Sequence, residues 1–374
     1  MRVVVSGGGT GGHIMPALAI VESVCRLVPG SERLYIGAHT GMESEIVPRL
    51  GVPYQSITTQ KLTKTLSFST AKVMLSLWKG YHEAIEYLKA FRADVVIGTG
   101  GYVAAAAIRA AVKLDIPTFI HEGNAVAGRT NLWLAQSATR IGTTFEEAVT
   151  EFPRKKTIVT GLPLREGIIA PDSLTAQNAR AEFEGLDPSR FTVLVTGGSQ
   201  GARNLNTILL ETVPILLEAG MQVLHLTGAK NFEMVQAEAQ ERGLLSRAGY
   251  LPRAFCNEQE MPSAWRAADV VLCRGGASTL SEALANCLPA VIVPLPTAYA
   301  DHQTANARVV EKHGAGVLCH EPTLTPEILT ENLVRLQEDS AYYAQVKSAT
   351  LTLRKPHAAD TVTREVLKML GKGE

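Results

Sequence analysis

Two stretches decide the fold of this chain: RVVVSGGGTGGH at residues 2–13 and TVLVTGGSQGA at residues 192–202. In each, a run rich in β-branched residues passes directly into glycines. A segment with apolar residues at helical spacing follows, at residues 17–27 in the first half and 204–217 in the second. This order predicts a buried strand, a glycine loop and a helix. The same unit therefore occurs once in each half of the chain.

Similar units surround these two stretches. Further strands are predicted at residues 34–36, 95–97 and 118–120, and again at 223–226, 270–273 and 290–293. Strands that alternate with helices indicate parallel sheets with right-handed crossovers. At 374 residues, the chain also exceeds the size at which one hydrophobic core usually stops growing. The predicted fold class is therefore α/β, with two Rossmann-like domains.

The domain boundaries follow from the same pattern. Gly161, Pro163 and Pro171 interrupt the chain where the first series of strands ends, which predicts a hinge there. We expect domains at residues 1–160 and 161–340. A helix-like stretch at about 342–370 has no strand after it, so we expect residues 341–374 to return to the first domain.

Composition excludes several functional classes. Lys plus Arg equals Asp plus Glu, at 36 each, so no overall positive field recruits nucleic acid. The five cysteines lack the CxxC spacing of a zinc or redox site. Their odd number and wide spread suit a reducing compartment. The chain enters a strand at once, without the pattern of a secretory signal. The most apolar long stretch, at residues 95–112, is interrupted by glycines and by Arg109. It therefore lacks the run of about 18 apolar residues that a membrane-spanning helix needs.

The first glycine loop resembles a dinucleotide-binding fingerprint but lacks its acidic residue. Gly7, Gly9 and Gly12 fit GxGxxG between a strand and a helix. The fingerprint requires a carboxylate at the end of the second strand to bind the ribose. The chain has Tyr35-Ile36-Gly37 there, and no carboxylate before Glu43. NAD is therefore disfavoured, and we expect no cofactor.

His13 directly follows this loop. A ring at the first turn of such a helix faces the crevice beyond the strand ends, where ligands of open α/β sheets bind. A neutral imidazole there can accept a proton from an attacking hydroxyl near neutral pH. The alternative interpretation is that His13 only caps or packs the helix.

Two later segments carry further polar candidates. CRGGASTLSE at residues 273–282 combines small residues with a helix start that suits a diphosphate. Glu282, one turn into that helix, can accept hydrogen bonds from ribose hydroxyls, or it is an ordinary surface glutamate. The segment at 301–307 carries Gln303 and Asn306, whose amides suit sugar hydroxyls. Its alternative role is a helix start capped by Asp301.

Six ordered motifs together resemble a known enzyme family. They are GGGTGGH at 7–13, GTGGYV at 98–103, HEGNAVAGRTN at 121–131, GGSQGARNLN at 197–206, CRGGASTLSE at 273–282 and DHQTANA at 301–307. Over nearly the whole chain they resemble the peptidoglycan-synthesising transferases of the GT-B superfamily, which are inverting enzymes that use nucleotide sugars. The resemblance implies two Rossmann-like domains that face each other across a cleft.

The resemblance also implies a reaction. N-acetylglucosamine passes from UDP-N-acetylglucosamine to the 4-hydroxyl of undecaprenyl-diphospho-N-acetylmuramoyl-pentapeptide, a lipid-linked acceptor. The family's enzymes work as peripheral proteins on the cytoplasmic face of the cell membrane. We expect no metal requirement, because the chain has no cluster of ligands with metal-binding spacing.

Site residues carry over position by position from the resemblance. It implies His13 as the catalytic base, with Glu122 as the rival, and these two remain open from the sequence. The implied donor-binding residues are Thr10, Gly11, Gly12, Asn124, Arg165, Ser199, Gln200, Ala277, Ser278, Thr279, Glu282, Gln303 and Asn306. The implied residues for the diphosphate and muramyl parts of the acceptor are Gly9, His13, Gly100, Gly101, Tyr102, His121, Glu122 and Asn124.

The chain departs from the family pattern in two places. Gly123 stands where the family often has glutamine, which removes one possible acceptor contact. FCNEQEM at residues 255–261 lacks the aliphatic residue expected at uracil, so uracil recognition stays unassigned.

Residues 61–81 form a candidate membrane surface. Val73, Met74, Leu77, Trp78 and Tyr81 share one helical face, after Leu66 and Phe68 and beside Lys61, Lys64, Lys72 and Lys79. Such a pattern suits an anionic bilayer. An ordinary core-facing helix with its lysines in water is the alternative.

Three rival functions also fit parts of the pattern. A GT-B enzyme with another acceptor is disfavoured by the motifs at 98–103 and 121–131. A UDP-sugar epimerase needs no acceptor and no membrane face. A regulator that binds nucleotide sugars binds without turnover.

Overall fold

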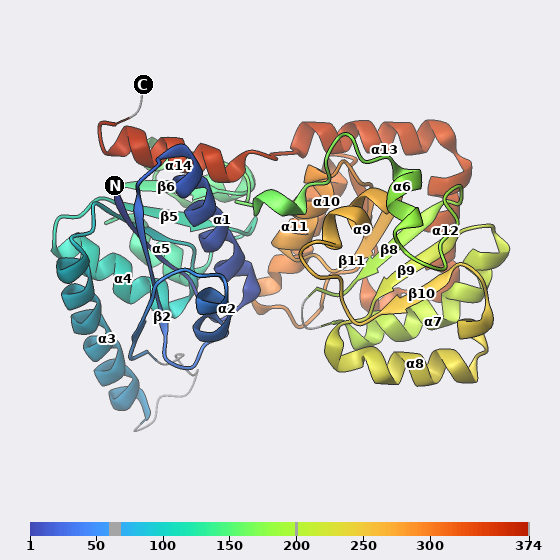
Figure 1. Cartoon of the computed structure of the whole chain (residues 1–374), viewed down its shortest axis with the longest axis horizontal. Helices are drawn as coiled ribbons and strands as arrows, with labels where there is room; N and C mark the ends of the chain where they lie inside the picture. The colour runs from blue at the N-terminus through green and yellow to red at the C-terminus, as the bar shows by residue number, and fades with distance from the viewer. Residues whose placement is uncertain (60–68, 199–200, 373–374) are drawn as a thin grey trace. The chain divides into compact units, whose positions relative to one another are not determined.

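The computed structural model describes residues 1–59, 69–198 and 201–372, and for residues 69–74 it describes the backbone only. The chain divides into two compact units (Figure 1). The first unit contains Met1–Glu166 and His357–Glu374, and the second contains Gly167–Pro356.

The first unit is built on a seven-stranded parallel sheet in the order β3-β2-β1-β4-β5-β6-β7. The strands are β1 (Arg2–Ser6), β2 (Glu32–Ala38), β3 (Tyr54–Ile57), β4 (Val95–Gly98), β5 (Thr118–Glu122), β6 (Arg140–Thr143) and β7 (Thr157–Val159). Its α-helices are α1 (Gly11–Leu27), α2 (Glu43–Arg49), α3 (Ser69–Phe91), α4 (Gly101–Lys113), α5 (Arg129–Ala135) and α14 (Ala358–Met369).

Both faces of this sheet are buried, because successive side chains of a strand point to opposite faces. Val3 and Val5 of β1 lie in a core cluster with residues of α1 and α14. Val4, between them, lies in a second cluster with residues of α3, α4 and α5. All three valines are fully buried.

The C-terminal helix α14 lies beside α1 (Figure 1). Between them, the Ser23 hydroxyl donates to Asp360 Oδ1 at 2.7 Å, and Thr363 Oγ1 donates to Ser23 Oγ at 2.8 Å. Arg26 of α1 also forms an ion pair with Asp360. The hydrogen bonds from Ser23 and Arg26 lower the pKa of Asp360 against the opposing effect of desolvation. The predicted return of the terminal helix to the first domain is confirmed for α14.

The second unit repeats the plan on a six-stranded parallel sheet in the order β10-β9-β8-β11-β12-β13. The strands are β8 (Thr192–Thr196), β9 (Gln222–Leu226), β10 (Tyr250–Arg253), β11 (Val270–Cys273), β12 (Ala290–Ile292) and β13 (Gly316–Leu318). The helices are α6 (Ala176–Ala181), α7 (Arg203–Glu218), α8 (Phe232–Glu241), α9 (Met261–Ala267), α10 (Ala277–Ala285), α11 (His302–Lys312), α12 (Pro326–Glu338) and α13 (Ser340–Leu353).

The strand orders explain where ligands can bind. In each sheet the chain order reverses at the first strand: β1 lies between β2 and β4, and β8 lies between β9 and β11. Ligands of open α/β sheets bind beyond the carboxyl ends of the strands at such a switch point. The loops after β1 and β4 in one unit, and after β8 and β11 in the other, are therefore the candidate ligand loops. The predicted α/β fold with two Rossmann-like domains is confirmed.

Two boundaries differ from the sequence-based expectation. The single helix-like stretch at 342–370 is two helices, α13 and α14, separated by Arg354–His357. Pro356 lies in that break, and proline cannot donate the backbone hydrogen bond that continues a helix. Residues 341–356 consequently belong to the second unit rather than to the first.

The first unit also ends at Glu166 rather than at residue 160. Arg165 Nε lies 2.8 Å from Glu22 Oε1, and Arg26 Nε lies 3.5 Å from Glu166 Oε2. These two ion pairs attach the chain to α1 beyond the glycine and proline residues that suggested the hinge.

Candidate functional site

In the first unit, the glycine loops after β1 and β4 interlock at the switch point. The Thr99 amide donates to Ser6 O at 3.0 Å, and Thr99 Oγ1 donates to His13 O at 2.7 Å. A Cβ atom at Gly7 would overlap Thr99 Oγ1, and one at Gly101 would lie 2.5 Å from Gly8 O. The loops approach this closely because these positions carry no side chain.

His13 lies in the first turn of α1 and is held by the second loop. Its Nδ1 lies 2.9 Å from Thr99 O, a carbonyl that can only accept a hydrogen bond. Nδ1 therefore carries the proton in the neutral ring, and Nε2 carries the lone pair. A Cβ atom at Gly100, whose φ is +109°, would lie 2.7 Å from this ring. The arrangement fixes the tautomer that a general base needs.

The rest of the first loop surrounds His13. Thr10 precedes α1 in extended conformation, and Gly11 and Gly12 begin the helix. Tyr102, at the start of α4, places its ring 3.7 Å from the position of a Cβ at Gly9. Burial, and then the charge of Glu43, raise the pKa of the Tyr102 hydroxyl, so this group remains a hydrogen-bond donor at neutral pH.

His121, at the end of β5, is buried within the unit. Its Nε2 lies 2.9 Å from Gly161 O and 3.0 Å from Thr160 Oγ1. Desolvation lowers the pKa of His121 to about 4, so the ring is neutral at physiological pH. These contacts join β5 to the segment after β7, which favours a structural role over direct contact with an acceptor.

Glu122 is buried, and all its observed contacts are internal. Oε1 accepts from the Asn124 amide at 2.9 Å and from Asn124 Nδ2 at 3.3 Å. Oε2 accepts from the Gly128 amide at 2.9 Å and from Asn131 Nδ2 at 2.8 Å. Four donors thus hold the carboxylate as the centre of the loop that follows β5. This favours a structural role for Glu122, and His13 remains a candidate for the base.

In the second unit, the start of α10 and the start of α11 are joined. Asn306 Nδ2 donates to Gly275 O at 3.0 Å, and Asn306 is buried. A Cβ atom at Gly275 would overlap the carbonyl of Gln303, while Gln303 Oε1 accepts from the Leu295 amide at 2.9 Å. The starts of these two helices therefore lie side by side. They carry five residues predicted to bind the nucleotide sugar: Ala277, Ser278, Thr279, Gln303 and Asn306.

The start of α10 suits an anion. Gly276 precedes the helix, and Ala277, Ser278 and Thr279 form its first turn, partly exposed. The first amides of a helix have no partner within the helix, and its dipole favours negative charge there. A diphosphate can therefore be bound at this end without a metal ion.

Arg274 supports this loop from behind and is itself buried. Arg274 Nη1 donates to Val293 O at 3.0 Å and forms an ion pair with Glu321. Glu321 Oε1 also accepts from Asn204 Nδ2 of α7 at 3.0 Å. The guanidinium thus ties the loop after β11 to the ends of β12, β13 and α7.

Glu282 lies one turn into α10 and is half-buried. Desolvation raises its pKa to about 7, from a usual value of 4.5. Hydroxyl groups of a ligand that donate hydrogen bonds to such a desolvated carboxylate stabilise its charged form. Binding of ribose hydroxyls by Glu282 stays a prediction from the sequence.

Arg165 is a further residue that the resemblance assigned to the nucleotide sugar. Arg165 belongs to the first unit and forms an ion pair with Glu22 of α1. Ser199 and Gln200 lie outside the described residues. In the unassigned uracil region, Phe255 is 63% exposed, and Asn257 Oδ1 accepts from the amides of Gln259 and Glu260.

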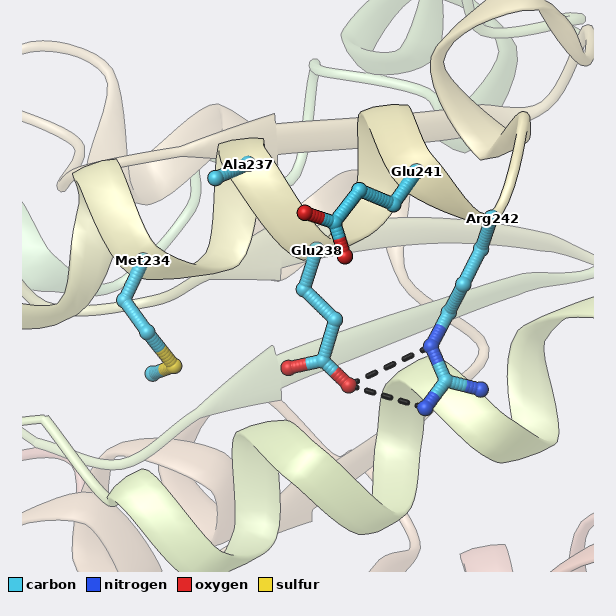
Figure 2. A pocket seen from close by; sticks show the side chains of 5 residues that line it. All are labelled: Met234, Ala237, Glu238, Glu241 and Arg242. Atoms are coloured by element: carbon cyan, nitrogen blue, oxygen red, sulfur yellow. Dashed lines mark hydrogen bonds and ion pairs between the residues drawn. The ribbon is translucent and has the colours of Figure 1, made fainter.

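A surface hollow of about 540 Å³ lies over α8 and contains none of the predicted site residues. Figure 2 shows its lining side chains, Met234, Ala237, Glu238, Glu241 and Arg242. Arg242 donates to Glu238 Oε1 from Nε at 3.2 Å and from Nη2 at 2.9 Å. With two glutamates and one paired arginine, this hollow is poorly suited to a diphosphate.

The candidate membrane segment is partly described. Lys61, Lys64, Leu66 and Phe68 lie outside the described residues, as do the side chains of Lys72, Val73 and Met74. In the described part of α3, Leu75 and Trp78 are 64% and 61% exposed, whereas Ala84 and Leu88 are fully buried. Leu75 and Trp78 thus expose apolar side chains, while Ala84 and Leu88 of the same helix pack in the core.

Among the residues that the structure describes, no helix is both long enough and apolar enough to cross a membrane. Across residues 1–59, 69–198 and 201–372, no group of three or more His, Cys, Asp or Glu side chains is arranged to hold a metal ion.

Sequence reasoning missed two residues that organise the first unit. Thr99 supplies the carbonyl that fixes His13, and the only signal for it was its position inside GTGG. Glu43 is fully buried beside the first glycine loop. Its signal was the short glycine-containing segment GAHTGME at residues 37–43, which brings an acidic residue back toward that loop.

Comparison with known proteins identifies two family domains. The glycosyltransferase family 28 N-terminal domain matches residues 3–143, and the glycosyltransferase family 28 C-terminal domain matches residues 192–362. Together they cover most of the chain in the order in which the two units follow each other.

Full-length relatives give a more specific likeness. The chain is 38% identical over 359 residues to a Bacillus pumilus protein, with 96% of each chain covered. It is also 38% identical over 375 residues to a Desulforudis audaxviator protein, with 100% of each covered. Both relatives are named UDP-N-acetylglucosamine–N-acetylmuramyl-(pentapeptide) pyrophosphoryl-undecaprenol N-acetylglucosamine transferase.

Solved structures agree with this likeness. The crystal structure of Acinetobacter baumannii MurG is 29% identical, covers 98% of this chain and 99% of its own, and has a TM-score of 0.74. A UDP-N-acetylglucosamine 2-epimerase also matches, with a TM-score of 0.67 over 99% of this chain and 97% of its own, but at 13% identity. That second likeness shows a shared fold alone.

Because its pKa is raised, ionisation of Glu282 should lower the free energy of unfolding as pH rises. The folded state holds this proton more tightly than the unfolded state, so the contribution of Glu282 to stability falls as pH rises from about 4.5 to about 7. We expect E282Q to be more stable relative to the unsubstituted protein at about pH 8 than at about pH 5. Urea unfolding of both proteins at the two pH values measures this. An equal difference at both values contradicts it.

Proposed function

The chain belongs to glycosyltransferase family 28, and we propose that it transfers N-acetylglucosamine from UDP-N-acetylglucosamine to the 4-hydroxyl of undecaprenyl-diphospho-N-acetylmuramoyl-pentapeptide. The observation that carries this proposal is likeness over nearly the full length to relatives named for this transfer, at 38% identity. The geometry of both units supports it, because one presents a base and the other an anion-binding helix start with a nearby carboxylate.

His13 is the proposed general base. Its Nε2 accepts the proton of the muramyl 4-hydroxyl while the oxygen attacks the anomeric carbon of N-acetylglucosamine. A bond from this oxygen to the anomeric carbon forms as the bond from that carbon to the diphosphate oxygen breaks. Attack on the face opposite UDP inverts the anomeric centre and gives a β-linked disaccharide. The hydrogen bond from Nδ1 to Thr99 O supports this role by leaving the lone pair on Nε2.

The second unit is the proposed donor side. The first turn of α10 stabilises the negative charge that develops on departing UDP, without reorganising as the bond breaks. Glu282 accepts hydrogen bonds from the ribose hydroxyls, which favours its charged form and draws its pKa below about 7. Gln303 is the proposed sugar contact, while Asn306, which is fully buried and donates to Gly275 O, supports the loop before α10. Ser199 and Gln200 remain proposed contacts of the nucleotide sugar outside the described residues.

The first unit is the proposed acceptor side. Gly9, Gly100, Gly101 and Tyr102 contact the acceptor around His13, and Asn124 lies on the loop that Glu122 organises. His121 and Glu122 support these contacts from within the fold. Thr10, Gly11 and Gly12 reach the donor from the start of α1. Arg165 contributes to donor binding if its ion pair with Glu22 opens.

The exposed part of α3 is the proposed membrane contact. Leu75 and Trp78 present exposed apolar side chains, and Lys79 beside them is exposed but lies 3.8 Å from Glu83 Oε1 in an ion pair, so the apolar side chains carry this proposal. The substrate named for the relatives is bound to undecaprenol, so a peripheral position on the cytoplasmic face of the membrane brings the enzyme to its acceptor.

The two rival functions, an epimerase and a regulator, differ from the transferase in their use of an acceptor and in turnover. An epimerase consumes UDP-N-acetylglucosamine without an acceptor, and a regulator binds it without turnover. The 2-epimerase is only 13% identical to this chain, so that likeness concerns the fold alone. The transferase relative is 38% identical over the full length.

Purified protein should release UDP from UDP-N-acetylglucosamine only when a lipid-linked muramyl-pentapeptide is present, and should form the lipid-linked disaccharide. We expect the rate to survive EDTA, because the first turn of α10 can bind diphosphate without a metal ion. Product analysis with and without acceptor measures this. UDP-sugar conversion without acceptor would favour the epimerase, and donor binding with no turnover would favour the regulator.

H13N should lower kcat by roughly 10²- to 10⁴-fold while leaving the Kd for UDP-N-acetylglucosamine unchanged. Asparagine keeps an N–H that can donate to Thr99 O but supplies no base. E122Q is the comparison, because it replaces a carboxylate that accepts from four donors and should mainly lower the melting temperature. A stable E122Q protein with the larger loss of kcat would make Glu122 the base instead.

L75S combined with W78S should weaken binding to vesicles that contain anionic lipid, because it removes two exposed apolar side chains. It should raise the KM for acceptor embedded in vesicles and leave the KM for a short-chain soluble acceptor unchanged. Cosedimentation and the two KM values measure this. L351S, which removes an exposed leucine from α13 in the second unit, is the matched control. Equal effects of both variants would contradict the proposed surface.

A further inference from the structure

Glu43 is a fully buried carboxylate that the proposed reaction does not use. It is the first residue of α2 and lies next to the first glycine loop. Among the described residues, no Lys, Arg or His nitrogen lies within 4 Å of its carboxylate. Hydrogen bonds from the backbone therefore have to stabilise this group. A buried charge is costly unless hydrogen bonds compensate it.

Both oxygens of Glu43 accept from backbone amides. Oε2 lies 3.2 Å from the Gly9 nitrogen, in the glycine loop, and Oε1 lies 3.3 Å from the Ala38 nitrogen, at the end of β2. Only a carboxylate offers an acceptor to each of these two N–H groups. A glutamine of nearly the same shape would direct its own NH₂ group at one of them.

The surrounding backbone makes room for this carboxylate. Cβ atoms at Gly8 and Gly41 would both overlap Glu43 Oε1. Tyr35 and Tyr54 frame it and donate their hydroxyls to Gly7 O and Ala38 O, each at 2.6 Å. Burial raises the pKa of both tyrosines, and the charge of Glu43 raises it further. Both hydroxyls therefore stay protonated and remain donors.

The loop that Glu43 holds is the one that leads to His13. One side of Gly7–Gly9 contacts Glu43, and the other side contacts Thr99 and Gly101. Tyr102 packs on Gly9. Resting on the proposed function, we infer that Glu43 is a positioning residue for acceptor transfer: it fixes the first glycine loop and, through it, His13 and Tyr102.

The test compares E43Q with E45Q, which changes an exposed glutamate of the same helix. E43Q should lower kcat and raise the acceptor KM, with a combined loss in kcat/KM on the order of 10²-fold. The Kd for UDP-N-acetylglucosamine and the number of donor sites per chain should stay unchanged, because the proposed donor residues of α10 and α11 belong to the other unit. E45Q should match the unsubstituted enzyme.

A purely structural role would give a different result. It would lower the melting temperature and the number of donor sites per chain, while kcat per remaining site and the acceptor KM stayed the same. That pattern would overturn the inference.

G8A provides a second variant if E43Q does not fold. It keeps Glu43 in the chain but displaces its carboxylate, since the added methyl would overlap Glu43 Oε1 and would lie 2.8 Å from Val103 Cγ1. We expect the same combination of lower kcat and higher acceptor KM. Unchanged kinetics in G8A would overturn the inference.

An NMR measurement separates this inference from the proposed function. E43Q should shift the imidazole signals of His13, and E45Q should not, whether or not the protein transfers N-acetylglucosamine. Unchanged His13 signals in E43Q overturn the positioning role. Absence of transfer by the unsubstituted enzyme, with shifted signals in E43Q, overturns only the proposed function.

Discussion

The organisation of the first unit depends on how closely two glycine loops approach each other at the switch point. Gly7 leaves room for Thr99, and Gly101 leaves room for the carbonyl of Gly8. This approach brings Thr99 O to within 2.9 Å of His13 Nδ1. The tautomer of the proposed base is thus decided by backbone packing, since a side chain at either glycine would separate the loop that carries the base from the loop that orients it.

The two units use the same fold for opposite electrostatic tasks. In the first unit, the glycine loop donates its Gly9 amide to the chain's own buried carboxylate, Glu43. In the second, the loop after β11 leads into the partly exposed first turn of α10, and Arg274 of that loop is paired with Glu321. The amides of this helix start suit an external anion.

Polar residues of one motif can serve the fold itself. His121 and Glu122, at the end of β5, are buried and bound within the fold, and Asn124 lies on the loop that follows them. A motif of polar residues can therefore reflect the hydrogen bonds that a loop needs as much as the ligand that it binds. Burial distinguishes these roles, because a carboxylate that already accepts from four donors has little remaining capacity for a substrate.

The sequence by itself determined the fold class and the positions of the ligand loops, because β-branched runs that pass into glycines are local patterns. β11 begins and ends at the predicted residues 270–273, and β1 and β8 coincide with the β-branched runs before the two glycine loops. Tertiary structure alone decided which polar side chains are buried, since that depends on contacts between segments far apart in sequence. The approach of Glu43 to Gly9 and the contact of Thr99 with His13 are of this kind. Each arises from packing against distant strands and helices, which no spacing along the chain encodes.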